Sequence, residues 1–380
     1  MHDQENIDGL GAACNGQAGQ RRALGDIGNN IGAGVGGGAK RAGVLTRRAA
    51  AQLQAAENGN AQGRDSWGGR PRGGLRPRDE QIPVVGRSRF GDGDEEMRSA
   101  VKQRRMDDVD VADAKNPLAA ADFVKYIFKS YRSLEQNMTI SSTYMSRQQD
   151  INEKMRSILI DWLVDVHLKF KLVPETLYLT MNLIDRFLMV KSVSRKHLQL
   201  VGVTAMLVAS KYEEIWAPEV RDFVYISDRA YNRDQILNME KIMLNSLKFN
   251  LTIPTHYHFL HRFLKVAGLA EDAEAVNYAT YLVELALPDY SMLRFKYSQI
   301  ASASVYATLA KFGHATVHGE LQKHSTHSHH DLRECIEMLH TLYNKAPEGS
   351  LTAVYKKFSL EKFHNVANSG PPPLGAPMEF

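Results

Sequence analysis

From residue 119 onward, apolar positions recur about every 3.6 residues, and short polar turns separate segments of helical length. No sustained alternation of apolar and polar residues is present, so we expect an all-α protein without a sheet. Pro254 divides the helical region, because proline disfavours helical geometry at the residue before it. The pattern predicts a leading helix over 119–135, a first set over 153–170, 175–189, 195–212, 217–225 and 233–247, and a second set over 255–266, 271–287, 297–312, 329–345 and 349–357.

The first 116 residues lack this pattern. Of the 28 glycines, 21 precede residue 118, whereas only Trp67 and Phe90 of the 32 aromatic residues do. Such a segment cannot bury enough apolar surface to offset the entropy of ordering it. The sequence therefore predicts a disordered tail over 1–116.

The predicted helix over 153–170 carries two apolar faces, whereas a surface helix normally has one. Two interpretations remain open: a central helix that is buried all round, or a helix with one face in the core and the other in an exposed docking groove. The first face consists of Met155, Ile158, Leu159 and Trp162, and the second of Ile160, Leu163, Val164 and Leu168.

Charge and composition exclude several classes of protein. The net charge of +4 is spread over nearly balanced acids and bases, which gives no basis for nucleic-acid binding. Cys14 and Cys335 are too few for a disulfide framework and fit a reducing compartment. No apolar run approaches 18 residues and the start lacks an apolar signal core, so we expect neither a membrane partner nor secretion.

Candidate catalytic and metal-binding motifs are weak. The glycines at 32, 34 and 37 match a dinucleotide fingerprint, but no strand precedes them, as that motif requires. Histidines 324, 327, 329 and 330 have only Cys335 nearby, and we interpret them as part of a polar turn before a helix. No serine, histidine and carboxylate grouping stands out. We therefore expect a protein that is not an enzyme, with no cofactor and no metal.

The helical segments resemble a known family. MRSILIDWLVDVHLKF (155–170), LQLVGVTAMLVASKYEEIWAPEV (198–220) and YNRDQILNMEKIMLNSLKFNLTIPT (231–255) are similar to the cyclin box of mitotic B-type cyclins. His167 and Lys169-Phe170 resemble the B-type cyclins of the green lineage.

The resemblance covers about residues 118–367 and implies a tandem cyclin fold of two five-helix repeats. The implied parts are a disordered regulatory tail (1–116), an N-terminal cyclin box with a leading helix (117–252), a C-terminal cyclin fold (253–367) and a flexible proline-rich tail (368–380). Tyr297 departs from the family, which usually has proline there, so we expect a less sharply fixed helix start.

The resemblance also assigns a substrate-docking patch, which would receive basic-x-leucine motifs of kinase substrates and inhibitors. An apolar groove with an acidic rim can bury a leucine and attract a neighbouring cation. The patch residues are Met155, Ile158, Leu159, Trp162, Asp165 and Gln199. Arg156 points toward the other face, and the resemblance supplies Asp185 as its structural ion-pair partner.

Lys211 and Glu240 match the positions with which cyclins bind a cyclin-dependent kinase. Charged groups suit bonds to kinase backbone, since such bonds are stronger than neutral ones. An internal bridge between the two residues remains an alternative. The apolar remainder of this surface would be Tyr212, Ile215, Leu244, Phe249, Leu251 and Ile127, several of which could equally belong to the core.

The tail contains a motif that resembles the extended destruction box of mitotic cyclins, R-x-x-L-x-x-I-x-N. Its residues are Arg21, Leu24, Ile27 and Asn29, within residues 21–29. A segment of this kind would enter the receptor groove of a ubiquitin ligase of the anaphase-promoting type, with weak and reversible binding. The basic run 102–105 is a candidate nuclear import signal, and we expect the protein in nucleus and cytoplasm.

These features together predict a regulatory subunit that binds and activates a mitotic cyclin-dependent kinase, recruits its substrates and is destroyed by ubiquitin-dependent proteolysis. The alternative is a cyclin-fold adaptor or scaffold of the transcription type, which docks partners but is not degraded in the cell cycle. The destruction box separates the two, because its removal would not change abundance under the alternative.

Overall fold

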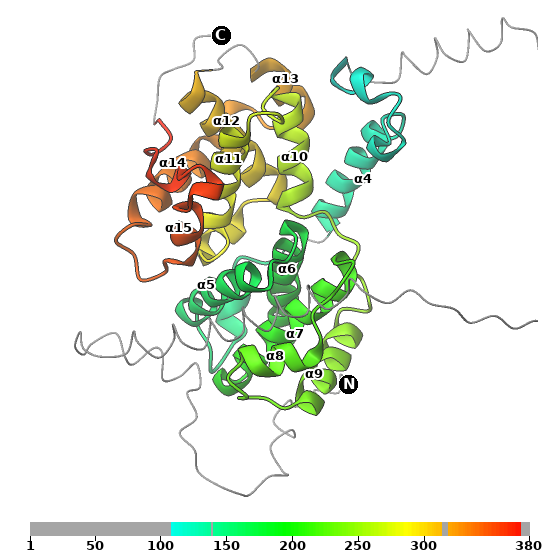
Figure 1. Ribbon diagram of the computed structural model, residues 1–380, viewed down its shortest axis with the longest axis vertical. Coiled ribbons are helices and arrows are strands. Elements are labelled where there is room, and N and C mark those ends of the chain that lie inside the picture. The colour runs from blue at the N-terminus through cyan, green and yellow to red at the C-terminus, as the bar shows by residue number, and fades with distance from the viewer. Residues whose placement is uncertain (1–107, 138–139, 314–317, 374–380) are drawn as a thin grey trace, which may run out of the picture. The chain divides into compact units, whose positions relative to one another are not determined.

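A computed structural model describes residues 108–137, 140–313 and 318–373. Within these ranges every regular element is an α-helix or a 3-10 helix, which confirms the prediction of an all-α protein (Figure 1). Helix α4 (Val124–Asn137) comes first, and two sets of helices follow it.

The first set packs around α7. It consists of α5 (Glu153–Phe170), α6 (Pro174–Val190), α7 (Arg195–Glu213), α8 (Val220–Ile226) and α9 (Arg233–Ser246). Nearly every α7 side chain from His197 to Ser210 is buried. Gly202 allows α5 to come close, since a Cβ there would lie 2.7 Å from Leu159 Cδ1.

The second set packs around α12 in the same way. Its helices are α10 (His256–Val266), α11 (Ala273–Ala286), α12 (Tyr297–Phe312), α13 (His318–Ser325), α14 (His329–Lys345) and α15 (Ala353–Phe358). The run Ala301 to Ser304 is fully buried on α12, and these small side chains let the neighbouring helices approach closely. Helix α13 was not predicted, because its only buried apolar side chain is Leu321.

Helix ends differ from the predictions where side chains cap them. Helix α8 begins at Val220, not at 217, because Glu219 and Asp222 form a reciprocal capping box. Helix α15 begins at Ala353, not at 349, and its first backbone N–H donates to Asp161 on α5 at 2.9 Å. Capping interactions of this kind cannot be read from apolar periodicity.

The predicted boundaries of the two tails are wrong. Residues Asp108–Asp113 form a 3-10 helix, and the buried Asp110 accepts bonds from Arg262 at 2.6 and 2.9 Å and from Lys265 at 2.8 Å. At the other end, Gly370 donates from its backbone to Tyr343 and accepts from Tyr278. Ordered chain therefore extends beyond 117–367 on both sides, held by side chains of the second set.

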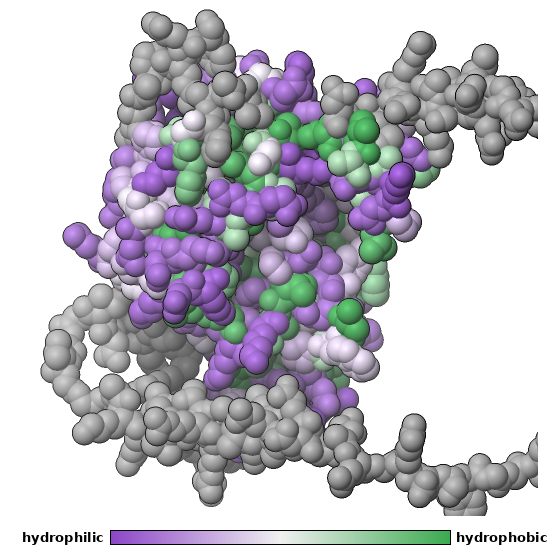
Figure 2. All heavy atoms as spheres, turned by 45° about the horizontal axis from the view of Figure 1, so that its top comes forward, coloured by the Kyte–Doolittle hydropathy of each residue, from purple (hydrophilic) through white to green (hydrophobic). Residues whose placement is uncertain are grey.

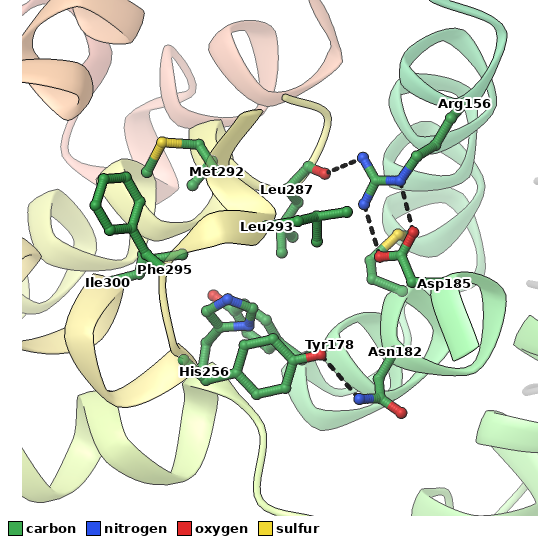
Figure 3. Close-up of a pocket in the computed structure, with 13 residues that line it drawn as sticks. Arg156, Tyr178, Asn182, Asp185, His256, Leu287, Met292, Leu293, Phe295 and Ile300 are labelled. Atoms are coloured by element: carbon green, nitrogen blue, oxygen red, sulfur yellow. Dashed lines mark hydrogen bonds and ion pairs between the residues drawn. The ribbon is translucent and has the colours of Figure 1, made fainter. Parts of the chain in front are cut away.

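Arg156 links the two sets, and Asp185 of the first set holds it in place. Arg156 Nε and Nη2 donate to the two Asp185 oxygens at 2.6 and 2.7 Å, and both side chains are buried. Arg156 Nη1 also reaches the carbonyl of Leu287, beyond α11, at 3.1 Å (Figure 3). The adjoining cavity, which His256 also lines, encloses only about 20 Å³, room for about one water molecule and not for a ligand.

The start of α12 is held by groups that the sequence did not reveal. Glu135 of α4 accepts from the backbone N–H and the hydroxyl of Ser298, both at 2.7 Å. The Tyr297 hydroxyl accepts from Asn182 at 2.8 Å, and its ring lies 4.1 Å from that of His256. These contacts hold the start of α12 at Tyr297 and Ser298 without a proline.

Candidate functional site

Lys211 and Glu240 lie together on the surface between α7 and α9. Lys211 Nζ donates to both oxygens of Glu240, at 2.6 and 2.8 Å. The Lys211 side chain is 47% exposed, so the pair is open to solvent on the lysine side. The structure thus contains the internal bridge that the sequence left as an alternative to kinase contact, and its Glu240 side chain is only 13% exposed.

Large apolar side chains are exposed at the end of α7 and in the segments that follow α7 and α9. Ile215 is 90% exposed, Phe249 is 64% exposed and Tyr212 is also exposed. The Tyr212 hydroxyl lies 2.6 Å from the Thr252 hydroxyl, which ties the end of α7 to the segment after α9. Large apolar side chains that stay exposed are candidates for a protein interface. We call Lys211, Tyr212, Ile215, Trp216, Glu240 and Phe249 the α7–α9 surface.

Trp216 was missed by the sequence analysis, although it is 90% exposed. Its position after Ile215 and two residues before Pro218 is the signal that could have found it. Proline keeps this short connection out of helical geometry, and an aromatic side chain in such a loop has little core to enter.

The backbone at Phe249 has an unusual conformation. Both Lys248 and Phe249 have positive φ, 53° and 54°, a region that bulky side chains rarely adopt. This conformation costs conformational free energy. Because the Phe249 ring is exposed, packing of the ring in the unbound protein does not offset that cost. This strain favours an interaction role for the Phe249 ring.

The other predicted members of this surface are less exposed. Ile127, Leu244 and Leu251 are half-buried, and the latter two pack against the core. On α4, burial raises the pKa of Tyr131, and the charges of Tyr212 and Glu213 at the end of α7 add to this rise.

The predicted docking patch on α5 is only partly open. Met155, Ile158 and Trp162 are half-buried, and Gln199 of α7 is also half-buried. Leu159 has no exposed surface, so the prediction that it belongs to an exposed stripe is wrong. Leu159 packs under the patch against α7 at Gly202. The face therefore combines both interpretations, a buried floor with half-exposed side chains above it.

Two carboxylates lie beside this patch on α5. Asp165 is exposed, and Asp161 accepts the bond from the Ala353 backbone. Burial raises the pKa of both carboxyl groups, and the Asp165 charge also raises that of Asp161. Lys356 acts in the opposite direction on both. The rim of the patch is thus acidic, and an additional cation there would be stabilised.

A groove of about 430 Å³ runs along α5 on the side of the second set. Ile158 lines it from α5, and Leu285, Leu351 and Val354 line it from the second set. Ile158 therefore connects the groove with the patch. Elsewhere the surface is mostly hydrophilic on the face seen in Figure 2, with hydrophobic side chains in separate clusters.

The remaining candidates either lie outside the described residues or take part in other contacts. Arg21, Leu24, Ile27, Asn29 and the basic run 102–105 lie outside the described residues. His324 contacts Arg262 and His327 contacts Ser298, and no group of metal-binding side chains occurs in the described part of the chain. None of the described helices is long and apolar enough to cross a membrane.

Comparison with known proteins identifies both halves of the helical region. Residues 126–252 match the family of cyclin N-terminal domains, and residues 254–372 match that of cyclin C-terminal domains. A viral cyclin from herpesvirus saimiri has the same fold, with a TM-score of 0.54 at 18% identity over 60% of this chain and 99% of that one.

Two curated relatives are plant proteins. Cyclin-B2-1 of Arabidopsis thaliana is 46% identical over 273 residues, 72% of this chain and 63% of that protein. G2/mitotic-specific cyclin-2 of Medicago sativa is 46% identical over 267 residues, 70% of this chain and 80% of that protein. The chain spans a little under two thirds of the length of the first of these relatives.

Both domain matches and the level of identity point to a family of regulatory subunits that are not themselves enzymes, which confirms the prediction of a non-enzymatic protein. The chain belongs to the cyclin family and, within it, to the B-type cyclins.

Proposed function

We propose that this protein is the regulatory subunit of a mitotic cyclin-dependent kinase, which it binds and activates to drive the G2/M transition. The observation that carries the proposal is the α7–α9 surface, in which Ile215, Trp216 and Phe249 are exposed on the segments that follow the two helices carrying Lys211 and Glu240. Burying these apolar side chains against a partner would be favourable at roughly 25 cal/mol per Å².

The Lys211–Glu240 bridge is exchanged on binding. The Lys211 side is open to solvent, so Lys211 can turn to the partner, and the charge-assisted bonds of both members to kinase backbone replace the bridge. Activation follows if the surface binds the active arrangement of the kinase's regulatory helix better than the inactive one, since the equilibrium then shifts toward the active state.

The α5 patch recruits substrates and inhibitors that carry a basic-x-leucine motif. Met155, Ile158 and Trp162 supply the half-exposed apolar side chains that contact a leucine, and Asp165 supplies the anion for the basic residue. Such a pair of contacts combines an apolar anchor with charge complementarity.

The tail carries the signal for degradation of the protein. The box at 21–29 is read by a ubiquitin ligase of the anaphase-promoting type, which ends kinase activation at mitotic exit. The basic run 102–105 directs import, so the protein acts in nucleus and cytoplasm.

The experiment is capture of a kinase from extracts of dividing cells with the full chain, followed by assay of histone phosphorylation in the eluate. Ile215→Ala with Trp216→Ala is expected to reduce captured kinase and its activity at least tenfold. Val190→Ala is the matched control, because Val190 is apolar, 52% exposed and outside this surface. Equal capture by the double variant and the control would refute the assignment of the surface. A second measurement compares the abundance of the full chain through mitosis with that of a variant lacking residues 21–29. If the chain captures kinase but the two abundances are the same, the adaptor alternative is favoured.

A further inference from the structure

The tail contains one basic-x-leucine triplet. Of the five leucines before residue 108, only Leu24 has a basic residue two positions earlier, which is Arg22. The same Leu24 belongs to the destruction box, whose arginine is the preceding residue, Arg21. Two overlapping motifs thus share one leucine but use different arginines.

The patch on α5 fits the second of these motifs. A leucine can rest on half-buried Ile158 and Trp162, and Asp165 lies one turn beyond Trp162, where it faces solvent. Asp161 adds a second negative charge at this rim, so an arginine that arrives here is attracted by both carboxylates.

The groove beside Ile158 fits the residues that follow. Ile27 comes three positions after Leu24, about 10 Å along an extended chain. The groove opens from Ile158 toward apolar Leu285, Leu351 and Val354, and its volume of about 430 Å³ can hold such a side chain. One segment can therefore fill patch and groove together.

We propose that, when no substrate is bound, the segment 22–27 of the same chain occupies the α5 patch and the adjoining groove. This inference rests on the docking role proposed above for the patch. Leu24 lies about 80 residues before Asp108, and an extended chain of that length spans up to roughly 260 Å, so reach does not prevent the contact.

Binding of the segment 22–27 to the α5 patch would also affect degradation of the protein. Leu24 and Ile27 are residues that the ligase would read, and the α5 surface covers them while the segment is docked. Substrate that enters the patch displaces the segment and exposes the destruction box. Substrate engagement and susceptibility to the ligase are then coupled through one surface.

The test uses a fluorescent peptide of residues 18–30 with Arg21→Ala, so that only the docking motif is intact. Its binding to the full chain is measured by anisotropy for the wild type, for Arg22→Ala and for Arg41→Ala, a matched loss of one tail arginine. Arg22→Ala is expected to bind the peptide about 3- to 10-fold more tightly than the wild type, because a tethered competitor has been removed. Arg41→Ala retains the wild-type affinity.

Asp165→Lys is the test of the patch itself, because Asp165 is exposed and its replacement does not disturb the core. It is expected to weaken peptide binding at least fivefold in the Arg22→Ala background. If Asp165→Lys weakens binding but Arg22→Ala equals the wild type, self-occupancy is wrong and docking stands. If the peptide binds equally to all variants or to none, the docking function itself fails. If the difference in peptide affinity between Arg22→Ala and the wild type increases with protein concentration, the tail of one copy binds the patch of another. That result overturns the intramolecular proposal.

Discussion

Replacing Asp185 by alanine is expected to destabilise the protein strongly. Asp185 accepts three bonds, from Arg156 Nε at 2.6 Å, from Arg156 Nη2 at 2.7 Å and from the Tyr144 hydroxyl at 2.7 Å. After Asp185→Ala the guanidinium stays buried with only the carbonyls of Leu287 and Pro288 as acceptors, at 3.1 and 3.3 Å. An uncompensated buried charge costs about 3 to 5 kcal/mol.

Two further variants divide this cost into its parts. Tyr144→Phe removes one of the three bonds and leaves the ion pair, so we expect a loss of about 1.5 to 3 kcal/mol. Arg156→Met combined with Asp185→Leu removes both charges, and this double variant is expected to lose less stability than Asp185→Ala alone. The reason is that removing both members of a buried ion pair lowers stability less than leaving one buried charge without its partner.

The measurement is urea unfolding followed by circular dichroism, with the free energy of unfolding taken by linear extrapolation. Because domains of this kind are stable by about 5 to 15 kcal/mol, a loss of 3 to 5 kcal/mol shifts the midpoint clearly. A loss below about 1 kcal/mol for Asp185→Ala, or a double variant less stable than the single one, would show that the buried pair does not hold the two sets of helices together.

Three other perturbations test the packing and the electrostatics of the fold. Gly202→Ala forces Leu159 to move, so we expect a loss of about 1 to 3 kcal/mol in urea unfolding and weaker binding of the motif peptide; unchanged values for both would contradict the close approach of α5 and α7. Burial lowers the pKa of His167 to about 4, with a contribution from Lys357, and that of His256 to about 3. Between pH 6.5 and 4 the unfolded chain therefore binds more protons than the folded one, so the free energy of unfolding decreases as the pH falls. At pH 5.5 the two histidines together lower it by about 3 kcal/mol relative to pH 8. His256→Gln should make the free energy of unfolding less dependent on pH over this range. Asp110→Ala leaves Arg262 without its carboxylate and should release residues 108–113, seen as lost hydrogen-exchange protection there while α12 stays protected.

Long periodic segments were predictable from the sequence. Helix α5 matches its predicted range, and α9 and α12 differ by at most one residue, because each presents apolar positions at helical spacing to a buried neighbour. Helix α13 was not predictable on this basis, since Leu321 is its only buried apolar side chain among the described residues. Its placement depends on tertiary contacts with α10 and α12.

Contacts between residues far apart in the chain account for the other differences. Asp110 looked like part of an unstructured acidic segment, and it is ordered by Arg262, about 150 residues later. Likewise, the apolar face of α5 gave no indication that Leu159 would be covered by α7 while Met155 and Trp162 stayed half-exposed. The pattern identifies apolar residues, but the neighbouring helix decides which of them remain accessible.

The groove beside the docking patch depends on the same contacts that join the two sets of helices. On α5, Arg156 and Ser157 donate to the Pro288 carbonyl, at 3.3 and 2.6 Å, and Asp161 caps α15 at Ala353. Pro288 lines the groove directly, and Val354, next to Ala353, lines it as well. The wall that faces Ile158 is therefore held by polar residues of α5 itself. Asp185→Ala removes the carboxylate that holds Arg156, so we expect it to loosen this wall and to weaken binding of the motif peptide at urea concentrations at which the protein is still folded. If α5 and α7 alone formed the docking patch, the variant would keep the wild-type affinity until it unfolds.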